Sequence, residues 1–131
     1  MPISETAIFG STNPKVSNDG TKRFVSIIGL EEEKEVYYRE LHANAWPAVI
    51  DRLKKSNIHN YSIHLGEIDS KKYLFSYFEY SGTDFEQDME YISQDEDTQR
   101  WWKETDPCQI VLEGVKNGER WKGLEQVFWL K

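Results

Sequence analysis

Cysteine is scarce in this chain of 131 residues, because Cys108 is the only one. A single cysteine excludes a disulfide within the chain, which fits a protein of a reducing compartment. No histidine stands next to Cys108 in the sequence to activate a nucleophilic thiol. We therefore expect Cys108 to be a buried or half-buried structural residue, with a nucleophilic role as the alternative.

Metal-ligand and cofactor motifs are also missing. The three histidines are scattered and show no His-x-x-x-His spacing, so no zinc site is expected. The sequence contains neither a Gly-rich nucleotide fingerprint nor a Gly-x-Ser-x-Gly elbow, although composition leaves a Ser-His-Asp triad open. We therefore expect any chemistry to proceed without a metal or a cofactor.

Basic residues are fewer than acidic ones, 16 against 23, and the formal net charge is -7. This charge repels the phosphates of nucleic acids and anionic membranes. No apolar run is long enough to span a membrane, and the N-terminus lacks the basic start and apolar stretch of a secretory signal. We expect a cytoplasmic protein with neither a nucleic acid nor a membrane as partner.

The first 21 residues are rich in turn-forming residues, at 10–14 and 17–20, and have little apolar periodicity. We expect residues 1–21 to form a flexible N-terminal extension. The remaining residues, 22–131, are enough for one domain with its own core.

Hydrophobic periodicity within that domain predicts alternating strands and helices. The expected strands are 23–30, 60–68, 72–80 and 126–130; the expected helices are 31–43, a short one from Pro47, one capped by Thr83 or Asp84, and 98–104 after a break near 95–97. The order is β-α-β-β-α-β, which indicates an α+β fold of the ferredoxin-like type. Its four-stranded antiparallel sheet carries helices on one face, so the open face favours a homodimer.

The first predicted helix carries Tyr38 and a candidate acid or base, His42, and the last predicted helix carries Trp101 and Trp102. Tyr38 and His42 are four residues apart and share one face of the helix. Trp101 and Trp102 diverge by roughly a hundred degrees on a helix, so one can pack in the core while the other lines a pocket. The structural alternative is that Tyr38 only packs and that His42 ends its helix.

The second predicted strand adds Tyr61, which shares a face with Ile63 and Leu65 and points toward the helices. Aromatic rings stack on the apolar C–H faces of sugars, and histidine passes protons near neutral pH. The combination indicates carbohydrate chemistry without a cofactor, whereas a core tyrosine bonded to backbone is the alternative for Tyr61. His59 and His64 are expected at the surface or an interface.

Five pieces of the sequence stand in a specific order and spacing: Tyr38, residues 42–47, residues 59–63, residues 99–103 and residues 124–130. Together they resemble the L-rhamnose mutarotase family over nearly all of residues 22–131. The resemblance implies a dimeric α/β-barrel type of fold and a cofactor-independent isomerase that interconverts the α and β anomers of L-rhamnose. It further implies that His42 is the proton donor and that Tyr38, Tyr61, Trp101 and Trp102 bind the sugar.

The sequence also departs from the family pattern as we know it. The N-terminal arm is longer, residues 95–98 are more acidic, and residues 106–121 differ from the short Met-Pro-rich loop of the bacterial enzymes. Another 6-deoxy sugar such as L-fucose is therefore an alternative substrate. Two alternative functions also stay open: a non-catalytic dimer that binds a sugar or another small molecule, and a cofactor-free monooxygenase of the same fold.

Overall fold

The structure of the chain is a computed structural model that describes residues 20–130. Its elements are β1 (Lys22–Leu30), η1 (Glu32–Lys34), α2 (Glu35–Ala43), α3 (Pro47–Lys55), β2 (Ile58–Ile68), β3 (Lys71–Tyr80), α4 (Phe85–Gln94), α5 (Glu96–Thr105), η2 (Asp106–Cys108), β4 (Gln109–Ile110) and β5 (Lys122–Leu124). The extension predicted for residues 1–21 lies almost wholly outside the described residues.

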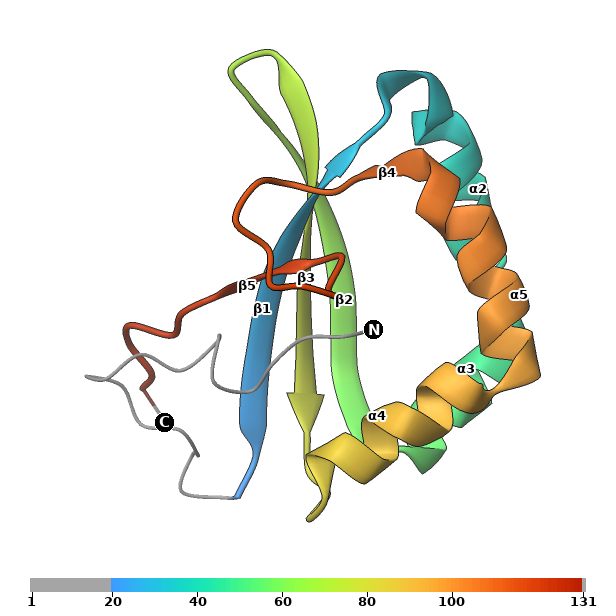
Figure 1. Cartoon of the computed structure of the whole chain (residues 1–131), viewed down its shortest axis with the longest axis vertical. Helices are drawn as coiled ribbons and strands as arrows, with labels where there is room; N and C mark the ends of the chain where they lie inside the picture. Colours follow the sequence, from blue (N-terminus) through green and yellow to red (C-terminus); the bar gives the residue numbers. More distant parts are fainter. Residues whose placement is uncertain (1–19, 131) are drawn as a thin grey trace.

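The strands form one five-stranded antiparallel sheet in the order β2-β3-β1-β4, with β5 also paired to β1. The sheet is curled, and helices α2 to α5 lie along one of its faces (Figure 1). This arrangement confirms the predicted ferredoxin-like α+β fold, with a pair of helices in each crossover.

The last strand differs from the prediction, which placed it at residues 126–130. The free edge of β1 is instead taken by β4, which pairs opposite Gly29 and Leu30, and by β5, which pairs opposite residues 25–27. A Cβ on Gly29 would lie 2.9 Å from the Cβ of Ile110, so this approach requires a glycine. The apolar residues of the predicted strand are 75–79% exposed at Val127, Phe128 and Leu130. They therefore do not pack against this sheet as a strand.

Local signals account for the other boundaries. The β2–β3 hairpin turns at Asp69 and Ser70, whose φ angles of 51° and 65° suit a tight turn between twisted strands. Asp84 caps α4 by accepting from the Gln87 N–H, and Asp95 caps α5 by accepting from the Thr98 N–H. The break predicted near 95–97 is therefore the junction between these two helices.

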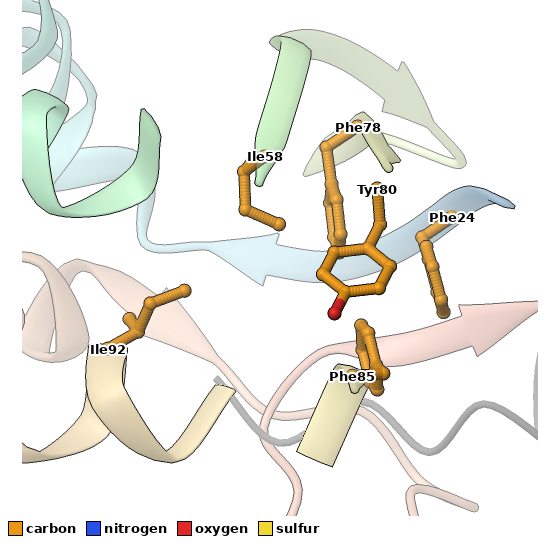
Figure 2. Packing of buried hydrophobic residues seen from close by; sticks show 6 residues of the cluster. All are labelled: Phe24, Ile58, Phe78, Tyr80, Phe85 and Ile92. Atoms are coloured by element: carbon orange, nitrogen blue, oxygen red, sulfur yellow. The ribbon is translucent and has the colours of Figure 1, made fainter. Parts of the chain in front are cut away.

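The core fills the space between the sheet and the helices. Alternate residues of β1 and β3 are buried on this face, and Phe24 stacks between Phe78 and Phe85 with ring centroids 5.0 and 4.8 Å away. Figure 2 shows this cluster, which also includes Tyr80, Ile58 and Ile92. A second cluster around Ile28, Leu30 and Leu74 includes Tyr38 and brings α2 against the sheet.

Candidate active site

A cavity of about 970 Å³ lies between the sheet and the helices, lined by residues of α2, α3, β2 and α5 among others. Its volume is near the upper end of the roughly 300–1,000 Å³ common for small-molecule sites. All five residues singled out in the sequence line it: Tyr38, His42, Tyr61, Trp101 and Trp102. Residues from two helices and one strand are therefore brought to one space.

His42 lies in the last turn of α2, and its ring contacts determine how it can act. Its Nδ1 lies 2.9 Å from the backbone oxygen of Tyr38. A carbonyl oxygen only accepts hydrogen bonds, so Nδ1 carries the proton and the neutral ring keeps its lone pair on Nε2. Burial lowers the pKa of His42, and the bond to the Tyr38 carbonyl only partly offsets this effect. The imidazole is therefore neutral at pH 7.

The aromatic rings hold His42 from two sides. The Tyr38 ring stacks on it with centroids 4.3 Å apart, and Trp101 meets it edge-on at 5.1 Å. Trp46, which precedes α3, meets Trp101 edge-on at 5.2 Å and supports it. This support of Trp101 by Trp46 emerges from the tertiary contacts alone.

Tyr38 is almost completely buried, with 5% of its surface exposed. Burial raises the pKa of Tyr38 to about 12, although a hydrogen bond from Gln109 opposes the shift. The phenol is therefore protonated at neutral pH and serves as a hydrogen-bond donor or acceptor rather than as a base.

Tyr61 enters the cavity from an irregular part of β2. The pairing with β3 shifts by one residue between His59 and Ser62, and Asn60 adopts a positive φ of 46° there. The Tyr61 ring lies against Phe78, with centroids 5.6 Å apart, and 36% of the residue is exposed. Burial around the phenol nevertheless raises the pKa of Tyr61, so this hydroxyl is also protonated at neutral pH.

The two tryptophans occupy different positions, and both line the cavity. Trp101 is buried against His42, whereas Trp102 is partly buried and packs against the cluster around Phe24. The helical spacing allowed one of them to pack in the core while the other lines a pocket, whereas the family resemblance implied that both bind the sugar. The cavity extends along α5 far enough to reach both.

Charged residues at the cavity wall were missed in the sequence. Glu35 and Arg39 line the cavity, and the Glu35 carboxylate accepts from Arg39 Nε at 2.9 Å and from Lys72 Nζ at 2.9 Å. These bonds, first that from Lys72, lower the pKa of Glu35. The sequence did contain a signal for Glu35 and Arg39, because residues 35, 38, 39 and 42 lie on one face of a helix at the standard spacing.

His64 does not line the cavity, and Cys108 packs in the same core cluster as Tyr38. His59 and His64 are exposed as predicted, although His59 reaches the cavity wall, and Cys108 is buried as predicted. Burial raises the pKa of the Cys108 thiol, which keeps it protonated. Among residues 20–130, no group of three His, Cys, Asp or Glu side chains is placed to hold a metal ion, and no helix is long and apolar enough to cross a membrane.

Comparisons with known proteins show which family the chain resembles. A family model described as L-rhamnose mutarotase matches residues 23–130. The chain belongs to the L-rhamnose mutarotase family. The L-rhamnose mutarotase of Bacillus subtilis (strain 168) is 34% identical over 86 residues, which make up 66% of this chain and 78% of that protein. The L-rhamnose mutarotase of Listeria monocytogenes serovar 1/2a is 30% identical over 109 residues, or 83% of this chain and 98% of that protein.

A solved structure supports the fold independently. The crystal structure of L-rhamnose mutarotase FA22100 from Formosa agariphila matches with a TM-score of 0.64 and 24% sequence identity, and the match covers 84% of this chain and 99% of that one. Family membership makes this chain an isomerase of the mutarotase type. The cavity is lined by an imidazole, phenols and indoles.

Proposed function

We propose that this chain interconverts the α and β anomers of L-rhamnose or a closely related 6-deoxy sugar, with His42 as the group that moves the proton. The observation that carries the proposal is the cavity in which a neutral imidazole is held between the rings of Tyr38 and Trp101. The names of the relatives supply the sugar class, since they are L-rhamnose mutarotases.

Anomer exchange by ring opening moves one proton from the anomeric hydroxyl to the ring oxygen. In our proposal His42 Nε2 takes the anomeric proton, the bond between C1 and the ring oxygen breaks, and its electron pair goes to that oxygen. The imidazolium then donates its proton to the ring oxygen, which leaves an open-chain aldehyde. After rotation about C1–C2 the same steps in reverse close the ring on the other face of C1. General acid–base catalysis of this kind contributes about 10²–10⁴-fold.

The other cavity residues bind the sugar in this proposal. Trp101 and Trp102 offer apolar faces to the C–H groups and the methyl group, because sugars stack on aromatic rings through these groups. Tyr38 and Tyr61 are protonated phenols, which donate hydrogen bonds to sugar oxygens. No metal or cofactor is needed, since only a proton is moved.

The first experiment is saturation-transfer NMR on equilibrated L-rhamnose, with L-fucose and D-glucose alongside. We expect the protein to accelerate exchange of L-rhamnose and the His42→Ala variant to lose at least about 10²-fold of this rate. His64→Ala is the matched control, because His64 is exposed and, within residues 20–130, its ring bonds to the Ser62 hydroxyl. A His42→Ala variant with undiminished exchange would refute the assigned role. Sugar-dependent tryptophan fluorescence without acceleration would indicate a binding protein instead.

We further propose that the chain works as a homodimer in the cytoplasm. The sheet face opposite the helices carries the neighbouring pairs Val25–Tyr77 and Ile27–Phe75, all half-buried, and the exposed apolar segment 127–130 follows β5. A second copy would cover this apolar surface. The single cysteine, which is buried and forms no disulfide, supports a location in the cytoplasm, because that compartment is reducing.

A further inference from the structure

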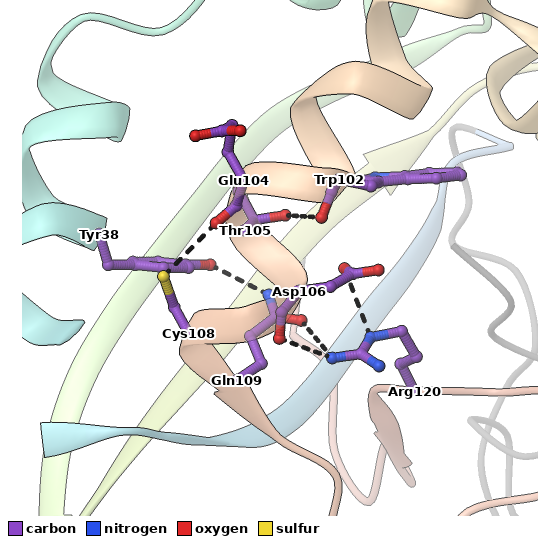
Figure 3. Close-up of polar contacts among 8 residues, drawn as sticks. All are labelled: Tyr38, Trp102, Glu104, Thr105, Asp106, Cys108, Gln109 and Arg120. Carbon is purple, nitrogen blue, oxygen red and sulfur yellow. Dashed lines mark hydrogen bonds and ion pairs between the residues drawn. The ribbon is translucent and has the colours of Figure 1, made fainter. Parts of the chain in front are cut away.

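Two polar side chains that do not line the cavity connect to Tyr38 (Figure 3). Gln109 of β4 places its Nε2 3.4 Å from the Tyr38 hydroxyl oxygen, and Arg120 places its Nη2 3.3 Å from Gln109 Oε1. Arg120 is held in turn by Asp106, with Nη2 3.1 Å from the backbone oxygen and Nε 3.4 Å from the carboxylate. A continuous polar path therefore runs from η2 to the cavity.

Arg120 determines the direction of every hydrogen bond along this path. A guanidinium only donates, so the amide oxygen of Gln109 faces Arg120 and the amide nitrogen faces Tyr38. An amide nitrogen also only donates, so the Tyr38 oxygen is the acceptor in that contact. The phenolic proton of Tyr38 is then left for a different acceptor.

We propose that Gln109 and Arg120 are positioning residues for Tyr38: they occupy a lone pair of its oxygen, so that the hydroxyl donates its proton to an oxygen of the bound sugar. The inference rests on the proposed function and deepens it. Because Tyr38 is only 5% exposed, water has little access to replace the amide. The direction of the Tyr38 hydroxyl is therefore set by residues more than seventy positions away in sequence.

The side-chain amide of Gln109 is not needed to hold β4 in the sheet. The strand is paired through its backbone, Gln109 opposite Leu30 and Ile110 opposite Gly29. A change in this side chain therefore leaves the strand pairing in place. It alters only the link between Arg120 and Tyr38.

A double-mutant cycle tests whether Gln109 acts through the Tyr38 hydroxyl. Gln109→Met keeps the length of the side chain and removes the donor, and we expect kcat/KM to fall by about fivefold to tenfold, as for one lost hydrogen bond. In a Tyr38→Phe background the same change should alter kcat/KM by less than about twofold, since no hydroxyl remains to position. Equal losses in both backgrounds, or no loss in the first, would overturn the proposal. Gln94→Leu on the exposed side of α4 is the control.

Gln109→Glu separates positioning from a merely structural role. The new carboxylate keeps the size of the residue and pairs well with Arg120, so a structural role predicts little change. Under our proposal it accepts the phenolic proton of Tyr38 and turns the hydroxyl away from the sugar. We therefore expect kcat/KM to fall further than in Gln109→Met, mainly through kcat, and an unchanged kcat would contradict the inference.

An NMR measurement on the sugar-free protein tests the hydrogen-bonded path from Arg120 through Gln109 to Tyr38 independently of activity. We expect the side-chain amide resonances of Gln109 to shift in both Tyr38→Phe and Arg120→Met, and not in Gln94→Leu. If the wild-type protein fails to accelerate anomer exchange of any sugar, the proposed function fails while these shifts still report the path. Amide resonances that do not respond to Tyr38→Phe would refute the path, even in an active enzyme.

Discussion

At the scale of single residues, the hydrogen bond of one ring nitrogen determines what His42 can do. Nδ1 is committed to the Tyr38 carbonyl, so only Nε2 exchanges protons with a ligand. Burial disfavours the imidazolium and lowers the pKa of His42 below its ordinary value. In the proposed mechanism the resting form therefore accepts a proton first and donates it afterwards, where the family resemblance implied a proton donor.

This assignment predicts the pH dependence of catalysis. Because the neutral imidazole starts the reaction, kcat/KM should be constant across neutral pH and should fall only below the ordinary histidine pKa of about 6.5. The free energy of unfolding should change in the same direction as kcat/KM. Because the unfolded state takes up the proton more readily than the folded state, stability should be lost as pH falls below about 6.5. The check is a pH–rate profile by NMR, with a denaturation series over the same range. An acid limb centred above 6.5 would contradict the assignment.

The adjacent tryptophans make a second prediction at this scale. Trp101 meets the His42 ring edge-on, so Trp101→Phe should lower kcat/KM for anomer exchange by about tenfold or more through loss of ring support. Trp102 packs against the cluster around Phe24, so Trp102→Phe should mainly lower the free energy of unfolding, by about 1 kcal/mol. Exchange rates and urea denaturation of both variants are the measurements. The reverse pattern would assign the opposite roles.

At the scale of elements, the two helices before η2 depend on separate caps. Asp95 accepts from both the backbone N–H and the hydroxyl of Thr98, which starts the helix that carries both tryptophans. Asp84 plays the equivalent part for α4, which carries none of the five candidate residues. The two caps therefore offer a matched comparison between stability and function.

We expect Asp95→Ala and Asp84→Ala each to lower the free energy of unfolding by about 0.5–2 kcal/mol, the usual cost of a lost N-cap. Only Asp95→Ala should also weaken sugar-dependent quenching of tryptophan fluorescence, because fraying of α5 displaces Trp101. Urea denaturation and fluorescence titration with L-rhamnose measure the two effects. Equal loss of quenching in both variants would show that the start of α5 has no special link to the cavity.

At the scale of the whole molecule, the helices of residues 20–130 cover one face of the sheet and leave the opposite face without helices (Figure 1). Phe128, at 75% exposure, lies in the apolar segment after β5 that we assign to the dimer contact. Phe128→Glu should therefore shift a dimer toward monomer, since burying one Phe side chain contributes about 1.5–3 kcal/mol. Val36→Glu is the control, because Val36 is similarly exposed, at 68%, but lies on α2 on the helical face. Sedimentation equilibrium of the wild type and both variants measures the proportion of dimer. A monomeric wild type would contradict the dimer proposal.

Much of this fold was predictable because its signals are local. The β2–β3 hairpin, the start of α3 at Pro47 and the caps of α4 and α5 each depend on residues within a few positions of one another. The pairing of the β1 edge was not predictable in the same way. Residues 126–130 have a strand-like pattern, but the edge of β1 is occupied by the two shorter strands β4 and β5. Strand β4 can approach because Gly29 has no side chain, and a long connection then leads to β5.

The sequence by itself determined which residues share a face: Tyr38 with His42 on one helix, and Tyr61 with Ile63 on one strand. These relations follow from the 3.6-residue and two-residue periods of the backbone. Only the tertiary structure decided that Trp101 meets His42 and that Gln109 reaches Tyr38. Such contacts join residues far apart in the chain, and they form only when the packing of α2, α5 and β4 against the sheet brings them together.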